Sequence, residues 1–378
     1  MALTKGYIRS TERSVTQAQT CVSSWAPKVI RFVVPMNRPS PHSWDNVSFH
    51  LIRELSSMGI PLSVMEYVRN RSASIGAGQG DVVVFMFRPV RTTREIAYQL
   101  CGNVKGTKIC YSMAPESTRV SREEVDCYNS CFNAVFVPSS FCKATLLSSG
   151  VTRPIHIVRH GFDPSVFFNT HRNFDSKPLR LLYVGKGQAH KNPQAIHDAM
   201  GLLLDGEYRH DPIELVVKGP AGFNVEDSAR RGLPTVKYIH EELDTARLGD
   251  IYRSCHIGIL CSHGEGFGLT GLEALATGMP IVTAKFGGVM EYANDKNSFF
   301  ADSIRIPSAN TNGNVGEWVK VMPAKLAMLI GALSRNRLLI KEKASVARPS
   351  VDHLTWRNSA SEFVRAVGAV SNVEAITN

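Results

Sequence analysis

The 378-residue chain lacks any apolar run of the roughly 18 to 20 residues that a helix needs to cross a bilayer, although 43% of its residues are hydrophobic. Residues 1–26 are rich in Ser and Thr and lack the apolar centre of a signal peptide. We therefore expect a cytoplasmic protein, either free in solution, peripheral to a membrane, or on DNA. A chain of this length and apolar content is expected to form two domains.

Cysteine is also sparse. The eight cysteines are too few for a disulfide framework and lack the paired spacing of a zinc site. Cys127 and Cys131 are four residues apart, as on one face of a helix, but no second Cys or His pair lies near them in the sequence. We therefore expect free thiols, a reducing compartment and no metal site.

Acidic residues are scarce in the first part of the chain. The formal net charge is +10, and residues 1–160 hold 19 Lys and Arg against 10 Asp and Glu, whereas residues 161–378 hold 24 against 23. Nine of the ten excess positive charges thus lie in the first part, which predicts an anionic partner there. No recognised RNA- or DNA-binding motif accompanies this charge.

Short β-branched runs alternate with longer amphipathic stretches in two series, a pattern that predicts two α/β domains with parallel sheets. The first series predicts a helix over 46–58 and strands at 29–34, 60–65, 81–87, 107–112, 133–137 and 155–159. The second series predicts strands at 179–185, 213–218, 235–239, 256–260 and 280–284.

These series divide the chain into five parts. We predict an N-terminal tail or arm (1–26), a first Rossmann-like domain (27–160), a linker (161–178), a second Rossmann-like domain (179–350), and a C-terminal helix that closes back on the first domain (351–378). Ligands of such sheets bind at the carboxyl ends of the strands, so the cleft between the domains is the expected site.

A glycine-rich segment, residues 263–280, follows the predicted strand at 256–260. Its glycines let the backbone approach a ligand, and the free N–H groups of a helix predicted from about Gly268 suit a phosphate. Glu265 lies in the loop and Glu273 about a turn and a half inside the helix, so both can face one cleft. A carboxylate accepts two hydrogen bonds at once, which suits a ribose diol or a pair of sugar hydroxyls. Alone, Glu265 could equally be an acid favoured by the helix dipole.

A second loop, residues 185–192, ends the predicted strand at 179–185. Its Lys186 and Lys191 precede a predicted helix and would supply positive charge to a leaving diphosphate. Other nucleotide-sugar enzymes use a metal on an Asp-x-Asp pair for this task, and the sequence contains no such pair. Either lysine alone would be an ordinary solvated residue, but with the glycine-rich segment they predict phosphate binding without a metal or other cofactor.

Residues 133–356 resemble the family-4 retaining glycosyltransferases of GT-B fold. The resembling segments are 137–143, 157–164, 185–191, the pair Glu265-x7-Glu273, and 353–356. The resemblance implies two Rossmann-like domains that face each other across a cleft. It also implies transfer of a sugar from a UDP- or GDP-sugar with retention of configuration.

The resemblance further implies roles for single residues. Glu265 would lie near the transferred sugar, Lys186 and Lys191 on the diphosphate, and these three are the predicted catalytic residues. Lys186 stands where the family usually has Arg, which keeps the charge but not the forked geometry. The implied donor-binding residues are Gly185, Gly187, Gly219, Tyr238, His240, Gly266, Phe267, Gly268, Leu269 and, on the donor ribose, Glu273.

The acceptor is expected on the first domain. Three arginines follow the predicted strand at 81–87 and would lie at its cleft-facing edge, where cations at a helix N-terminus indicate an anionic ligand. Glu116 and Arg119 lie in a loop that resembles the acceptor loop of some family members. Trp44 stands in the segment 37–46 that replaces the family's usual glycine-rich loop, and could stack on a sugar or base or simply pack. The expected acceptor-binding residues are Trp44, Arg88, Arg91, Arg94, Glu116, Arg119 and His160.

The sequence therefore predicts a retaining glycosyltransferase whose anionic acceptor is a glycan or lipid at a membrane surface. The alternative acceptor is phage-type DNA that carries modified (hydroxymethylated) bases. Two more distant hypotheses are a glycoside hydrolase that uses the two glutamates as acid and nucleophile, and a non-enzymatic protein that binds nucleic acid or membranes through its basic first domain.

Overall fold

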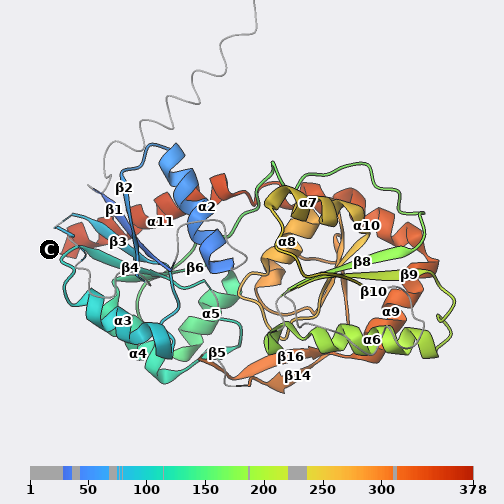
Figure 1. Cartoon of the computed structure of the whole chain (residues 1–378). Coiled ribbons are helices and arrows are strands. Elements are labelled where there is room, and N and C mark those ends of the chain that lie inside the picture. Colours follow the sequence, from blue (N-terminus) through green and yellow to red (C-terminus); the bar gives the residue numbers. More distant parts are fainter. Residues whose placement is uncertain are drawn as a thin grey trace, which may run out of the picture.

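The computed structural model describes residues 29–35, 43–67, 75, 77–78, 80–113, 115–185, 188–219, 236–309 and 313–377. The predicted tail 1–26 lies outside these residues, and so do Lys186 and Gly187 of the loop 185–192. The two series of βα units form two six-stranded parallel sheets, one in each half of the molecule (Figure 1). This confirms the predicted fold class.

The first sheet has the strand order β2-β1-β3-β4-β6-β7. Its strands are β1 (Ile30–Val34), β2 (Leu62–Glu66), β3 (Val82–Phe85), β4 (Thr107–Tyr111), β6 (Ala134–Val137) and β7 (Ile155–Ile157). Its helices are α2 (Ser43–Ser57), α3 (Arg91–Cys101), α4 (Arg122–Cys131) and α5 (Ser140–Ser149). All residues of β3 and β6 are buried, because helices cover both faces of the sheet, which explains their unbroken apolar runs.

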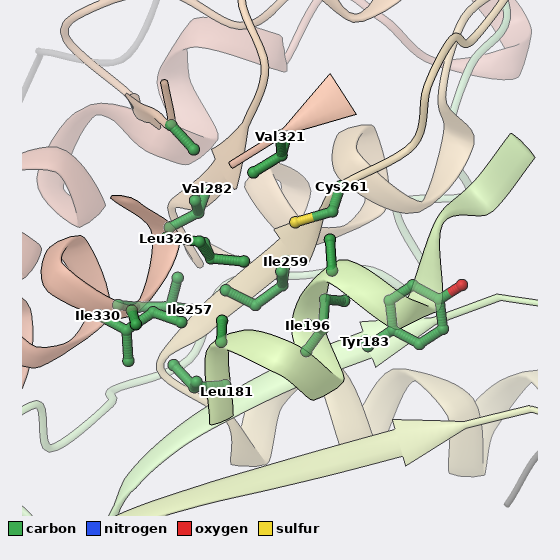
Figure 2. Close-up of a cluster of buried hydrophobic side chains, with 14 of the residues drawn as sticks. Leu181, Tyr183, Ile196, Ile257, Ile259, Cys261, Val282, Val321, Leu326 and Ile330 are labelled. Carbon is green, nitrogen blue, oxygen red and sulfur yellow. The ribbon is translucent and has the colours of Figure 1, made fainter. Parts of the chain in front are cut away.

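The second sheet has the strand order β10-β9-β8-β11-β12-β13. Its strands are β8 (Leu179–Val184), β9 (Ile213–Lys218), β10 (Val236–Ile239), β11 (Ile257–Leu260), β12 (Ile281–Thr283) and β13 (Ser298–Phe300). Its helices are η1 (Ala189–Lys191), α6 (Pro193–Asp205), α7 (Thr245–Ser254), α8 (Leu269–Ala276), η3 (Gly288–Glu291), α9 (Pro323–Arg335) and α10 (Arg337–Val351). One core between this sheet and α6 and α9 contains Leu181, Ile196, Ile259 and Leu326 (Figure 2).

The C-terminal helix α11 (Trp356–Thr377) lies on the first domain, beside α2 (Figure 1). Its Phe363 is fully buried and packs against Phe32 of β1 and Phe136 of β6, with ring centroids 5.6 Å apart in both pairs. The chain therefore passes between the domains twice, and the last helix completes the core of the domain in which the chain began.

A third connection between the domains was not predicted. Strands β14 (Ser303–Pro307) and β16 (Glu317–Val321) form an antiparallel pair, and β15 (Asn314–Val315) between them pairs with β5 (Arg119–Val120) of the first domain. Figure 1 shows β14 and β16 beneath the junction of the two domains, next to β5. Two-residue strands paired across nearly two hundred positions leave no periodic signal in the sequence.

The expectations about thiols and membrane helices can be compared with the described residues. The seven described cysteines are buried and free, and the Sγ atoms of Cys127 and Cys131 lie 3.9 Å apart on α4. Each helix in the described part of the chain is too short or too polar to span a bilayer. Within the same residues, no three His, Cys, Asp or Glu side chains are grouped as metal ligands.

Candidate functional site

The two loops predicted to bind phosphate lie side by side. In the second sheet the strand order reverses between β8 and β11, which are hydrogen-bonded neighbours. The loop after β8 carries Lys191, and the loop after β11 carries Glu265. The crevice at such a reversal is where open α/β sheets bind their ligands.

Lys191 and Glu265 form an ion pair across the two loops. The Lys191 Nζ lies 2.6 Å from Oε1 and 2.8 Å from Oε2 of Glu265, and the Ser262 hydroxyl donates to the same Oε1 at 2.6 Å. Burial would raise the pKa of the Glu265 carboxyl, but Lys191 and Ser262 outweigh it and hold this pKa below its ordinary value. Burial likewise opposes the charge on Lys191, but Glu265 raises the pKa of the ammonium. Both groups are therefore charged at neutral pH.

Backbone contacts hold the two loops together. The His263 N–H donates to the carbonyl of His190 at 2.7 Å, and the Asn192 amide donates to the carbonyl of Cys261 at 3.2 Å. Asn192 adopts a left-handed conformation with φ of 47° where α6 begins. The position of Lys191 relative to Glu265 is thus set by the backbone as well as by the ion pair.

The glycine-rich loop is also the place where the first domain meets the second. A Cβ on Gly264 would lie 1.8 Å from the carbonyl oxygen of Glu116, so only glycine allows this contact. The Ser139 hydroxyl of the first domain donates to the carbonyl of Gly266 at 2.7 Å. Helix α8 begins directly after Gly268, as the sequence predicted, and its first N–H groups are the predicted anion site.

The remaining residues of this loop are packed. Phe267 is buried between His160 and Tyr292, with ring centroids at 5.0 and 5.5 Å. Leu269 contacts buried clusters of both domains. We interpret both as residues that shape the loop through packing.

Glu273 lies in α8 and is bonded to α7. The Tyr252 hydroxyl donates to its Oε2 at 2.7 Å. Burial raises the pKa of the Glu273 carboxyl to about 7, a shift that the Tyr252 hydrogen bond only partly opposes. The pKa of Glu273 is thus raised, whereas that of Glu265 is lowered.

Three of the predicted donor-binding residues, Gly219, Tyr238 and His240, gather at the carboxyl ends of β9 and β10. His240 Nδ1 lies 3.3 Å from the Gly219 carbonyl oxygen, and its ring stacks on Tyr238 with centroids 5.5 Å apart. A depression of about 380 Å³ beside them is lined by Tyr238, His240 and the α7 residues Arg247 and Asp250. The same helix carries the Tyr252 that bonds Glu273, so α7 connects this depression to the glutamate.

Gly185 directly follows β8 and is the first residue of the loop 185–192. Its N–H donates to the Lys218 carbonyl at 3.0 Å, and a Cβ there would lie 2.7 Å from the Tyr183 hydroxyl oxygen. Lys186 and Gly187, which follow it, lie outside the described residues.

The first domain contributes Glu116 to the site. Its Oε1 lies 3.5 Å from His190 Nε2, the residue before Lys191. Arg91 at the start of α3 and Arg119 of β5 are exposed, and Arg94 is half-buried. Helix α3 has no acidic residue in its first turn and no side-chain cap, so no acid within that turn offsets Arg91 and Arg94.

Two predicted acceptor residues are corrected by the structure. Arg88 does not face the cleft, because its guanidinium is buried and bonded to Glu124 at 2.6 and 2.9 Å. His160 is 4% exposed and lies among aromatic rings, and burial lowers its pKa to about 3. Trp44 is half-buried and packs against two hydrophobic clusters of the first domain. Of the two roles considered for it, stacking on a ligand or packing, the structure shows packing.

Sequence reasoning missed several residues that complete the site. Ser262 is adjacent to the glycine-rich segment and could have been found from that position. Tyr252 and Ser139 reach the site from distant helices, and Asn314 reaches it from an unpredicted strand. Nothing in the local sequence of Tyr252 or Asn314 distinguishes them from ordinary surface or core residues, whereas Ser139 lies in the resembling segment 137–143 and was given no role there.

Known proteins resemble this chain in sequence and in fold. Residues 168–305 match the family model described as "Glycosyl transferases group 1". A D-inositol 3-phosphate glycosyltransferase of Catenulispora acidiphila is 33% identical over 127 residues, which are 31% of this chain and 30% of that protein. A glycogen synthase of Mycobacterium tuberculosis is 32% identical over 141 residues, or 36% of this chain and 33% of that protein. The chain thus spans about a third of the length of these relatives.

Solved structures share the whole architecture. HepE from Anabaena, in complex with UDP and glucose, superposes with a TM-score of 0.64 over 90% of this chain and 99% of that one, at 14% identity. Sucrose-phosphate synthase from Thermosynechococcus elongatus gives a TM-score of 0.66 over 91% and 99%, also at 14% identity. The two facing parallel-sheet domains are therefore the GT-B fold.

Proposed function

We propose that this protein is a glycosyltransferase that transfers a sugar from a nucleoside-diphosphate sugar, held by the second domain, to an acceptor held by the first. The observation that carries the proposal is the Lys191–Glu265 ion pair beside the glycine-rich loop, at the strand-order reversal of the second sheet. Both residues of this pair lie within residues 168–305, the segment that matches the glycosyl transferases group 1 model.

The ion pair has enough hydrogen-bond donors to bind the donor as well. An ammonium group has three N–H bonds, and in the described structure two of those of Lys191 are directed to the oxygens of Glu265. The third can donate to a phosphate oxygen, together with the first backbone N–H groups of α8. When the ammonium also donates to phosphate, an oxygen of Glu265 can accept a hydrogen bond from a sugar hydroxyl.

We further propose that transfer retains the anomeric configuration, as the resemblance to family-4 enzymes implies. The bond between the anomeric carbon and the phosphate oxygen breaks, and its electron pair stays on the diphosphate. The acceptor oxygen bonds to the same face of the sugar, and the leaving phosphate takes the acceptor's proton. Lys191, and Lys186 by sequence, stabilise the developing phosphate charge, and the Glu273 carboxylate holds the donor ribose.

The acceptor of this proposal is anionic. The exposed Arg91 and Arg119, the half-buried Arg94, and the excess of positive charge in residues 1–160 support it. We favour a glycan or lipid at a membrane surface, with DNA that carries hydroxymethylated bases as the alternative.

A thermal-shift panel of nucleotides and nucleotide sugars tests the proposal. We expect UDP, GDP or one of their sugars to raise the melting temperature in proportion to ln(1 + [L]/Kd), because such a ligand binds only the folded state. Lys191→Ala should lose most of that shift and reduce sugar transfer or donor hydrolysis by about a hundredfold or more. A panel without any nucleotide-dependent shift, or full turnover in Lys191→Ala, would contradict the proposal.

A further inference from the structure

The strands β14, β15 and β16 belong to an arm of the second domain that contacts the first; we call its described residues, 303–309 and 313–321, the clasp. Its β15 pairs antiparallel with β5, so that Asn314 lies opposite Val120 and Val315 opposite Arg119. The Thr118 N–H also donates to the Glu317 carbonyl at 3.1 Å, and the Thr118 hydroxyl accepts from the Glu317 N–H at 2.9 Å. The clasp thus adds a third contact between the domains to the two chain crossings.

Asn314 is the buried centre of this contact, with only 1% of its surface exposed. Its Oδ1 accepts from Arg88 Nη1 at 2.8 Å, and from the Glu116 N–H and the Ser117 hydroxyl, each at 3.2 Å. Its Nδ2 donates to Glu116 Oε2 at 3.2 Å. One amide therefore fixes both the backbone and the side chain of Glu116.

A buried ion pair anchors this amide on the first domain. Arg88 binds Glu124 through two parallel hydrogen bonds and gives its third nitrogen to Asn314. Gly313 crosses directly above the pair with φ of +73°, and a Cβ there would lie 2.6 Å from Glu124 Oε2. The clasp backbone thus lies close to the first domain at Gly313, and the Arg88–Glu124 pair supports Asn314. Both are features of an element that positions other residues.

The other carboxylate oxygen of Glu116 lies near His190, in the loop that carries Lys191. While Oε2 is held by Asn314, Oε1 lies 3.5 Å from Nε2 of His190, next to Lys191. Asn314 of the clasp therefore contacts Glu116, and Glu116 in turn contacts His190.

We propose that Asn314 is a positioning residue: through Glu116 it holds the His190–Lys191 loop in the geometry that binds the donor diphosphate. The inference rests on the proposed function for the identity of the ligand, whereas the mechanical role of the clasp does not. Its consequence is that donor affinity depends on a residue of the clasp that touches neither phosphate nor sugar.

An isosteric exchange of the amide and the carboxylate tests this role. Asn314→Asp keeps the acceptor oxygen for Arg88, Glu116 N–H and Ser117, but replaces the donor to Glu116 by a second carboxylate. At pH 8 we expect repulsion to displace Glu116, weaken UDP or GDP binding by roughly tenfold, and increase the radius of gyration in solution scattering. The double variant Asn314→Asp/Glu116→Gln restores a donor–acceptor pair and should return both readouts to within about twofold of the parent protein.

Thr118→Val is the matched control, because it breaks a clasp hydrogen bond that does not involve Glu116. We expect it to lower the melting temperature slightly and leave nucleotide affinity unchanged. The proposal is overturned if Asn314→Asp leaves affinity and radius of gyration unchanged, if the double variant folds but is not restored, or if Thr118→Val weakens binding equally. A parent protein that binds neither UDP nor GDP would contradict the proposed function instead, and solution scattering of the same variants would still decide whether Asn314 closes the domains.

Discussion

Two glutamates that the sequence places eight residues apart differ in their charge state. Glu265 is bonded to Lys191 and Ser262 and stays ionised, whereas Glu273 accepts a hydrogen bond from the Tyr252 hydroxyl and its burial raises its pKa to about 7. Ribose hydroxyls donate to a carboxylate and so favour its ionised form. The sequence spacing predicted both carboxylates but could not distinguish them, because the difference lies in their partners.

Donor binding should therefore depend on pH through Glu273. As pH rises from 5.5 through 7 the carboxyl ionises, and we expect UDP affinity to increase by up to about tenfold per pH unit before it levels off above 7. The sign for folding is opposite, because a carboxyl whose pKa is raised from 4.5 to about 7 stabilises the fold at low pH and loses that contribution as pH rises through this range.

The measurement is a calorimetric titration with UDP at several pH values. Glu273→Gln retains a polar side chain but cannot titrate, so its binding should lose the Glu273 part of the pH dependence and keep only that of the phosphate. Equal pH profiles for both proteins would show that Glu273 does not titrate with donor binding.

At the scale of elements, the glycine-rich loop has two tasks. Its helix start faces the proposed phosphate, and its first glycine, Gly264, lies against the Glu116 carbonyl of the first domain. The sequence assigned all the glycines of this loop to ligand approach. The structure shows that Gly264 is required for contact between the domains, a requirement that depends on a segment nearly 150 residues away.

Gly264→Ala should therefore separate the domains locally. Its Cβ would lie 1.8 Å from one backbone oxygen, which cannot yield without moving the whole 115–118 segment. We expect a melting temperature several degrees lower and turnover reduced by about tenfold or more, measured by calorimetry and by donor hydrolysis.

Gly201→Ala in α6 provides the control, because no atom lies within 4 Å of its added Cβ. This helix substitution should leave turnover unchanged and be neutral or stabilising by up to about 1 kcal/mol. If Gly264→Ala behaves like Gly201→Ala, the contact between loop and first domain is not tight in solution.

At the scale of the whole molecule, charge and architecture coincide. The two GT-B domains divide the chain near residue 161, and the excess positive charge lies almost entirely on the first side. Of the three arginines that first suggested an anionic ligand, Arg88 is buried in an ion pair with Glu124. Arg91 is exposed and Arg94 is half-buried. The electrostatic case for an anionic acceptor therefore depends on these two and on the overall excess.

Binding to anionic surfaces tests this case. We expect retention on phosphatidylglycerol vesicles that falls steeply between 50 and 300 mM salt, and that Arg91→Glu/Arg94→Glu reduces by about tenfold. The matched control is Lys296→Glu/Lys325→Glu, two exposed lysines of the second domain, which should change retention little. Preference for a duplex with hydroxymethylated cytosine over vesicles would favour the DNA alternative, and equal loss in both double variants would show that net charge alone is responsible.

The sequence by itself determined the alternation of strands and helices, the two-sheet fold class, and the two loops that meet at the strand-order reversal. These follow from local periodicity, from glycine-rich spacing and from the rule that parallel strands present their carboxyl ends together. Only the tertiary structure decided that Arg88 is an internal anchor, that Glu273 shares a hydrogen bond with Tyr252, and that Asn314 joins the domains through Glu116. Each of these is a contact between residues far apart in the chain, whose burial and partners exist only once the two domains have folded against each other.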